Sequence, residues 1–157
     1  MSGSEFCQQE MSNRLLAALP PEAYRSLQPN LEIVPLAFKQ VLVQPQEPML
    51  YVYFPTSSLV SLLTVMTDST AVEIGIVGNE GMIGIPVFLG TDRSTFRAIV
   101  QIPGEAVRLK ANVFKQAIAQ IEPLSFWIQR YINLLLIQIS QTSACNSRHS
   151  IEQRCCR

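Results

Sequence analysis

Histidine is nearly absent from this sequence, which has His149 alone among its 157 residues. Proton-transfer catalysis needs an acid and a base with tuned pKa values, and nucleophilic catalysis needs a base beside the nucleophile. The region of short strand patterns offers Glu73, Glu80 and Asp92 but no histidine. A metal-binding barrel would also need several histidine ligands. We therefore expect no enzyme activity.

Excess charge and long apolar runs are absent as well. Twelve Lys and Arg residues balance twelve Asp and Glu residues, so the chain has no long-range attraction for nucleic acid or anionic membranes. A membrane span needs about 18 uninterrupted apolar residues. The most apolar segment, 124–139, is interrupted by Gln129, Arg130, Asn133 and Gln138. No apolar segment of the signal-peptide type follows the polar first residues, and we expect no membrane partner.

Cysteine is too scarce for a disulfide framework or a CxxC metal motif. The four cysteines are Cys7, Cys145 and the adjacent pair Cys155 and Cys156. Free thiols are typical of cytoplasmic proteins, so we expect a cytoplasmic location. Residues 1–12 are predicted to be disordered or derived from a tag, because the MSGSEF start resembles a vector sequence.

The chain does contain a long series of short strand patterns. Two short helices come first, Asn13–Leu19 with Ser12 as its cap and Pro21–Leu27. The predicted strands are 31–36, 39–43, 50–54, 59–66, 71–77, 94–101 and 105–110. Seven short strands separated by turn residues predict an antiparallel sandwich or barrel. We assign residues 13–122 to this unit and expect Pro35 to mark an edge strand or a bulge.

Residues 123–149 predict one long helix, the longest element of the chain. Its first half is apolar nearly all round, whereas a helix covered on one side needs only an apolar stripe. We expect the barrel to cover one side and a second copy of the chain to cover the other; the alternative is an ordinary buried helix within a monomer. Coiled-coil spacing selects the predicted dimer contacts, which are Ile128, Tyr131, Leu135, Gln138, Thr142 and Cys145.

The chain ends on a helix-start signal. Ser150 opens a capping box, with Gln153 three residues later. A new helix is therefore expected at Ile151, and residues 150–157 are predicted to be the start of a truncated further domain, with Ser150 as the hinge.

Four glycines recur at every third residue before a short apolar segment: Gly75, Gly78, Gly81 and Gly84. Glycine tolerates positive φ and lets another backbone approach closely. The glycines either shape tight corners between strands or form a cradle of backbone N–H groups for an anion. The spacing favours corners, because no phosphate-loop Lys-Ser/Thr pair and no GxGxxG motif is present.

Five stretches, taken in this order, carry a family resemblance: NRLLAALPPE, VYFPTSSLVSLLT, VGNEGMIGIPVFLG, FRAIVQIPG and QTSACNSRHSIEQR. From about Asn13 onwards the chain resembles the N-terminal half of a Crp/Fnr-type bacterial transcription regulator. The resemblance implies a cyclic-nucleotide-binding-like jelly-roll β-barrel, flanking helices and a long dimerisation helix. It also implies that a helix-turn-helix DNA-binding domain follows in the full-length protein. The present chain has no basic patch, so we do not expect it to bind DNA alone.

The resemblance further implies what a cyclic-nucleotide site would need. Binders in this family have a glycine followed directly by glutamate, and later an Arg-Ser/Thr-Ala run that faces the phosphate. Here Ile85 and Pro86 follow Gly84, so the glutamate is missing and one backbone N–H is lost. The arginine is either Arg93 or Arg97.

We therefore expect that cyclic AMP is not the natural ligand and that the pocket holds a less polar effector or none. A cyclic-nucleotide sensor with a divergent cassette is the alternative. The candidate pocket residues are Gly84, Ile85, Pro86, Arg93, Ser94, Arg97, Ala98, Gln138 and Thr142.

One pair of side chains has metal-ligating chemistry. Cys145 and His149 lie four residues apart on the predicted helix and would share a face. Relatives that bind an iron–sulfur cluster carry several cysteines near the N-terminus, where this chain has only Cys7. We expect no metal or haem cofactor; a haem- or metal-based redox or gas sensor is the alternative.

Overall fold

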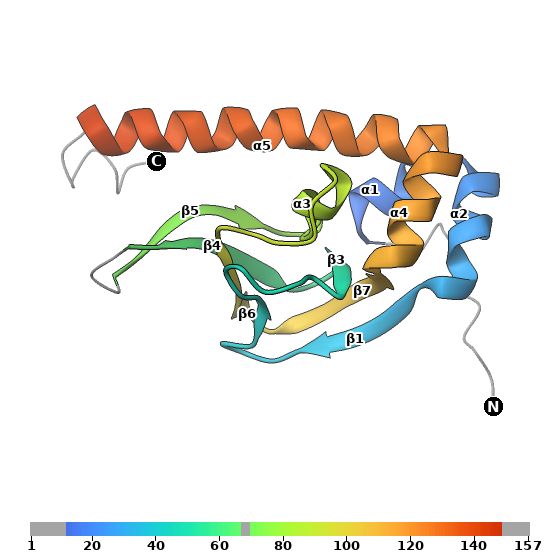
Figure 1. Cartoon of the computed structure of the whole chain (residues 1–157), viewed down its shortest axis with the longest axis horizontal. Helices are drawn as coiled ribbons and strands as arrows, with labels where there is room; N and C mark the ends of the chain where they lie inside the picture. Colours follow the sequence, from blue (N-terminus) through green and yellow to red (C-terminus); the bar gives the residue numbers. More distant parts are fainter. Residues whose placement is uncertain (1–11, 67–69, 149–157) are drawn as a thin grey trace.

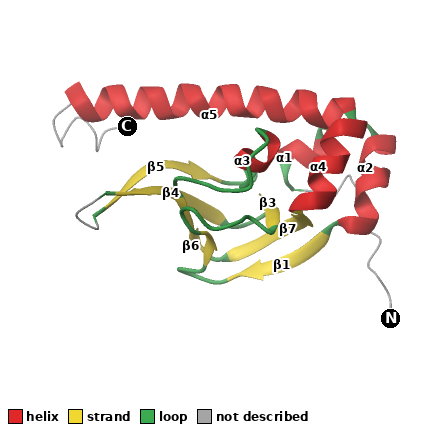
Figure 2. Cartoon of the chain, in the orientation of Figure 1, coloured by secondary structure: helices red, strands yellow, loops and turns green. Residues whose placement is uncertain are grey.

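The computed structural model describes residues 12–66 and 70–148, in which strands form a barrel flanked by helices (Figure 1). Figure 2 shows α1, α2 and α4 gathered at one end, with α5 running along one side. The elements are α1 (Arg14–Ala17), α2 (Pro21–Leu27), the 3-10 turn η2 (Gln28–Asn30), β1 (Glu32–Leu36), β2 (Val41–Val43), β3 (Tyr51–Pro55), β4 (Leu59–Val65), β5 (Ala71–Val77), α3 (Ile85–Phe88), β6 (Arg97–Ile102), β7 (Gly104–Lys110), α4 (Ala111–Gln120) and α5 (Glu122–Arg148).

The strands form two sheets, ordered β1-β7-β3 and β2-β6-β4-β5. All of the strand pairs are antiparallel. Alternate side chains point inward and fill the space between the sheets, as in other sandwiches and closed barrels. Fully buried examples are Val52, Phe54, Val60, Val77, Val100 and Leu109. This confirms the prediction of a mainly β jelly-roll barrel with flanking helices.

Strands β2 and β6 begin two and three residues later than the alternating pattern predicted. Lys39 has a positive φ of 64°, which no strand residue adopts, so β2 starts only after it. The hydroxyl of Ser94 accepts a hydrogen bond from the backbone N–H of Phe96 at 3.0 Å, and this turn delays β6 until Arg97. Pro35 lies in β1, an edge strand that pairs with β7 only. Its position agrees with the prediction, because proline cannot donate to a second neighbour.

The first helix is capped by Asn13 rather than by the preceding serine. Asn13 Oδ1 accepts hydrogen bonds from the backbone N–H groups of Leu15 and Leu16, at 3.1 and 3.2 Å. Its Nδ2 donates to the carbonyls of Pro55 and Gly81, both at 2.9 Å. The side chain is fully buried. One residue therefore starts α1 and ties it to the two turns on which it sits.

Helix α5 lies along the barrel and contacts β5 (Figure 1). Its buried side chains recur in steps of three and four residues, which is the spacing of one helix face. They include Leu124, Ile128, Tyr131 and Leu135. The predicted hinge Ser150, the adjacent His149 and the residues up to Arg157 lie outside the described residues.

Candidate functional site

The glycine-rich turn joins β5 to α3 and brings the chain close to β3. Gly84 has a φ of 123°, and a Cβ added there would lie 2.5 Å from Val52 Cγ1. Positive φ and close approach both require glycine. Helix α3 has only four residues, Pro86 carries no N–H, and the N–H of Val87 already donates to the Gly84 carbonyl. The start of α3 therefore offers fewer N–H donors than an ordinary helix start, which favours a corner over an anion cradle.

The two candidate arginines both contact the connection between β2 and β3. Arg93 Nη1 donates to the carbonyl of Gln46 at 2.7 Å. Arg97 Nε donates to Oε1 of Gln44 at 3.0 Å. The backbone reinforces the contact, since the N–H of Gln46 donates to the carbonyl of Ser94 at 2.8 Å. Each guanidinium group therefore donates one hydrogen bond to a neutral oxygen of this connection, and Arg93 Nε also lies 4.0 Å from Oδ1 of Asp92.

The other predicted pocket residues differ in burial. Ser94 and Ala98 are buried, and Ser94 Oγ is used inside its own turn. Gln138 is exposed on α5, and Thr142 is half-buried. Within the described ranges, no hydrogen bond joins Gln138 or Thr142 to the glycine-rich turn or to the arginines.

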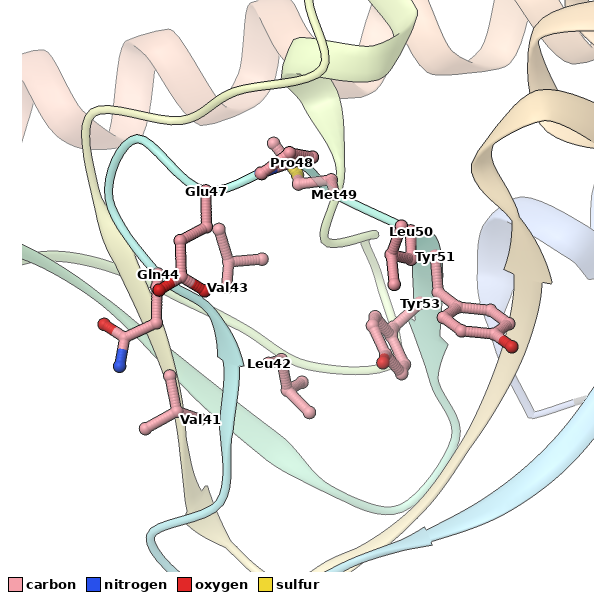
Figure 3. A pocket seen from close by; sticks show the side chains of 10 residues that line it. All are labelled: Val41, Leu42, Val43, Gln44, Glu47, Pro48, Met49, Leu50, Tyr51 and Tyr53. Atoms are coloured by element: carbon pink, nitrogen blue, oxygen red, sulfur yellow. The ribbon is translucent and has the colours of Figure 1, made fainter.

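An open cleft of about 340 Å³ lies between β2 and β3, next to the connection that the arginines hold. Figure 3 shows the side chains of Leu42 and Tyr53 in the space between the two strands, whereas Gln44 points away from it. Both strands are sheet edges, because β2 pairs with β6 only and β3 pairs with β7 only. Sequence reasoning did not identify this cleft. The only signal was the pair of prolines, Pro45 and Pro48, which predicted a turn.

Helix α5 is seated on the glycine-rich turn through Tyr131. Its hydroxyl donates to the carbonyl of Met82 at 3.4 Å, and burial raises the pKa of Tyr131 well above the ordinary value of 10.0. A Cβ on Gly81 would collide with the Tyr131 ring. Gly75 is in ordinary contact distance of Leu135 on the same helix. The glycine-rich turn therefore also serves to receive α5, a role that the spacing of the glycines did not indicate.

Four of the six predicted dimer contacts are buried within the single chain: Ile128, Tyr131, Leu135 and Cys145 are 0%, 5%, 7% and 7% exposed. In the single chain these four side chains face the barrel, and the six dimer contacts stay a prediction. The barrel covers that face, so a second chain could not reach it without displacing the barrel. The large exposed apolar side chains of α5 lie elsewhere, at Phe126 (49%), Leu134 (64%), Leu136 (58%) and Ile137 (58%).

No protein-family model and no curated sequence matches this chain. Solved structures do match it. CLP of Xanthomonas campestris, a global regulator responsive to c-di-GMP, superposes with a TM-score of 0.71 at 13% identity, over 86% of this chain and 68% of CLP. A CooA mutant from Carboxydothermus hydrogenoformans gives 0.68 at 12% identity, over 97% and 96%. The sensor domain of the transcriptional regulator DNR from Pseudomonas aeruginosa gives 0.65 at 15% identity, over 92% and 94%.

The fold is that of a cyclic nucleotide-binding domain. A domain of that description from Methylobacillus flagellatus also superposes, with a TM-score of 0.60 at 14% identity, over 92% of this chain and 83% of the other. At these identities the likeness establishes the cyclic-nucleotide-binding fold, but it does not identify a ligand.

Two further properties of this domain concern cofactors and membranes. Among the described residues, no three His, Cys, Asp or Glu side chains are grouped so that they could hold a metal ion. In the same part of the chain, no helix has both the length and the apolar composition needed to cross a membrane.

Proposed function

We propose that this chain is the effector-sensing and dimerising part of a Crp/Fnr-type transcription regulator and that it acts as a homodimer through α5. The observation that carries the proposal is α5 itself. Its 27 residues lie with one face on the barrel, while apolar side chains stay exposed elsewhere on its surface. A helix that served only its own domain would present polar residues there. DNA contact would belong to a separate domain, in keeping with the net charge of zero.

The proposed dimer contact is a stripe that we call the outer stripe, made of Arg130, Leu134, Ile137 and Gln141. Steps of four, three and four residues keep these side chains in line along a helix that packs against a copy of itself. The predicted contact Leu135 is one residue from Leu134. One residue rotates the position by about 100° around a helix, and here this separates buried Leu135 from exposed Leu134.

Matched charge substitutions test the dimer. Leu134→Glu would place a carboxylate at the centre of the outer stripe, and we expect a stable dimer to become a monomer by sedimentation equilibrium. Leu136→Glu is the control, because Leu136 is similarly exposed but lies off the stripe. Circular dichroism should show both variants folded. A wild-type chain that sediments as a monomer at high concentration, or equal effects of the two variants, would contradict the proposal.

We also propose that the effector is not cyclic AMP. Ile85 and Pro86 replace the polar groups of the phosphate cassette, and the guanidinium groups of Arg93 and Arg97 are held by the β2–β3 connection. A hydrogen bond to a charged group is worth roughly 1.5–3 kcal/mol. Two missing bonds therefore lower affinity by about 10²–10⁴-fold. CLP, which shares the fold, is described as responsive to c-di-GMP, so the fold itself does not require cyclic AMP.

Calorimetric titration of the chain with cyclic AMP and cyclic GMP tests this second proposal. We expect no heat of binding at micromolar concentrations of either nucleotide. Micromolar affinity for either one would overturn the proposal and establish a cyclic-nucleotide sensor with a divergent cassette. The dimer proposal would be unaffected by that result, because it depends on α5 alone.

A further inference from the structure

The sheet β1-β7-β3 carries an arginine that is fixed from two sides. Arg108 in β7 lies opposite Glu32 of β1 and Tyr53 of β3 in the strand register. The Glu32 carboxylate accepts hydrogen bonds from Arg108 Nε and Nη2, both at 2.9 Å. The guanidinium lies 4.4 Å from the centre of the Tyr51 ring. A guanidinium with both a bidentate partner and an aromatic partner has a fixed plane and position.

An open cleft of about 540 Å³ lies beside this arginine, lined by residues from the end of η2 to the start of α4. Its volume is within the range of about 300–1,000 Å³ that is usual for small-molecule sites. Tyr51 and Arg108 line it, and so do the polar side chains of Asn30, Lys110 and Asn112. These three side chains make no hydrogen bond or ion pair with any residue that the structure describes. We call this space the outer cleft.

The charges in the outer cleft favour an anion. Arg108 and Lys110 carry two positive charges and Glu32 carries one negative charge, so the side chains that line the cleft have a net charge of +1. The hydrogen bonds from Arg108 lower the pKa of Glu32, so this carboxylate stays ionised and paired at neutral pH. The charge of Lys110 also acts on Glu32, but its ammonium group makes no hydrogen bond in the described part of the chain. The amides of Asn30 and Asn112 can supply further N–H donors.

We propose that the outer cleft binds a small planar organic anion, a carboxylate or a phosphate ester. Lys110 and Asn112 would bind the anionic group. The planar part would lie against the Tyr51 ring, whose orientation is fixed by Arg108. The site is separate from the glycine-rich turn and from α5, so it does not depend on the proposed effector or on the dimer.

Titration of the ¹⁵N-labelled chain with benzoate and with phenyl phosphate, followed by NMR, tests the site. We expect saturable shifts confined to the backbone amides of Asn30, Tyr51 and residues 108–113. Lys110→Gln should weaken binding at least threefold. Lys115→Gln removes the same charge from α4 outside the cleft and should leave the affinity unchanged. The two probes show which anion the cleft prefers.

Three outcomes would overturn the proposal. Shifts that do not saturate, or equal weakening by both lysine variants, would mean that only general attraction of anions is present. Benzyl alcohol has the ring without the charge. If it bound as tightly as benzoate, binding would not depend on the negative charge, and the cleft would not be an anion site. Binding of a glutamate-rich peptide at the same amides, without binding of benzoate or phenyl phosphate, would assign the surface to a protein partner instead.

Discussion

Gly81 and Tyr131 show how a single missing methyl group positions a long helix. The Tyr131 ring occupies the space that a Cβ on Gly81 would need, and its hydroxyl reaches the carbonyl of Met82. Gly75 faces the same helix with room to spare, since an added Cβ would lie 3.8 Å from Ile139 Cγ1. The two glycines look alike in the sequence, but only one of them is required for the seat of α5.

This difference gives a prediction about stability. Gly81→Ala should lower the free energy of unfolding by about 1–3 kcal/mol, the usual effect of overpacking a closed site. Gly75→Ala should change it by less than about 1 kcal/mol, because its new methyl group is in ordinary contact distance. Urea unfolding measures both. Adding Tyr131→Leu to Gly81→Ala should recover part of the loss. A Gly81→Ala variant as stable as wild type would show that α5 is not seated as described.

At the scale of elements, the connection between β2 and β3 combines strain with strong contacts. Gln46 has a positive φ of 65°, a conformation that costs a residue with a side chain about 1–2 kcal/mol. Its carbonyl accepts from Arg93 and its N–H donates to Ser94. A glycine at position 46 would keep both of these backbone hydrogen bonds and relieve the backbone strain.

Gln46→Gly is therefore expected to raise the free energy of unfolding by up to about 1 kcal/mol. Glu47→Gly is the matched control: Glu47 is not among the positive-φ residues, so glycine there should destabilise by roughly 0.5–1 kcal/mol through the greater entropy of the unfolded chain. Both values follow from thermal unfolding. Destabilisation by Gln46→Gly would show that the Gln46 side chain has a structural role that the described contacts do not include.

Elements were easier to predict than their faces. The alternating pattern of apolar residues defined β5 as residues 71–77, and Pro21 marked the start of α2, both as observed. Ile128 and Leu135 face the barrel, whereas Leu134 and Ile137 are exposed. All four are equally apolar, so the sequence alone could not tell the two sides of α5 apart. The contacts of α5 with β5 and with the glycine-rich turn distinguish the two sides. The outer cleft could not be predicted either, because strand pairing assembles it from residues 32, 51 and 108, far apart in the chain.

For the molecule as a whole, the balance of charge leads to a prediction about DNA. Nucleic-acid affinity comes largely from cations that replace the counterions of phosphate groups. Here the net charge is zero, and Arg93, Arg97 and Arg108 are held by oxygen atoms of the chain. We expect no saturable change in the fluorescence anisotropy of a labelled duplex, even at low salt. Saturable binding that weakens as salt is added would contradict this expectation and reveal a DNA-binding surface on the barrel.

The length of α5 has a mechanical consequence. Its 27 residues make a rod of roughly 40 Å at 1.5 Å per residue. Tyr131 lies in the first half of that rod and is its fulcrum on the barrel. A tilt of about 5° would move the distant end by roughly 2–3 Å, given the rise per residue of a helix. Glu122 lies nine residues before Tyr131 and Arg148 seventeen residues after it, so a tilt about Tyr131 would move Arg148 roughly twice as far as Glu122, given the constant rise per residue.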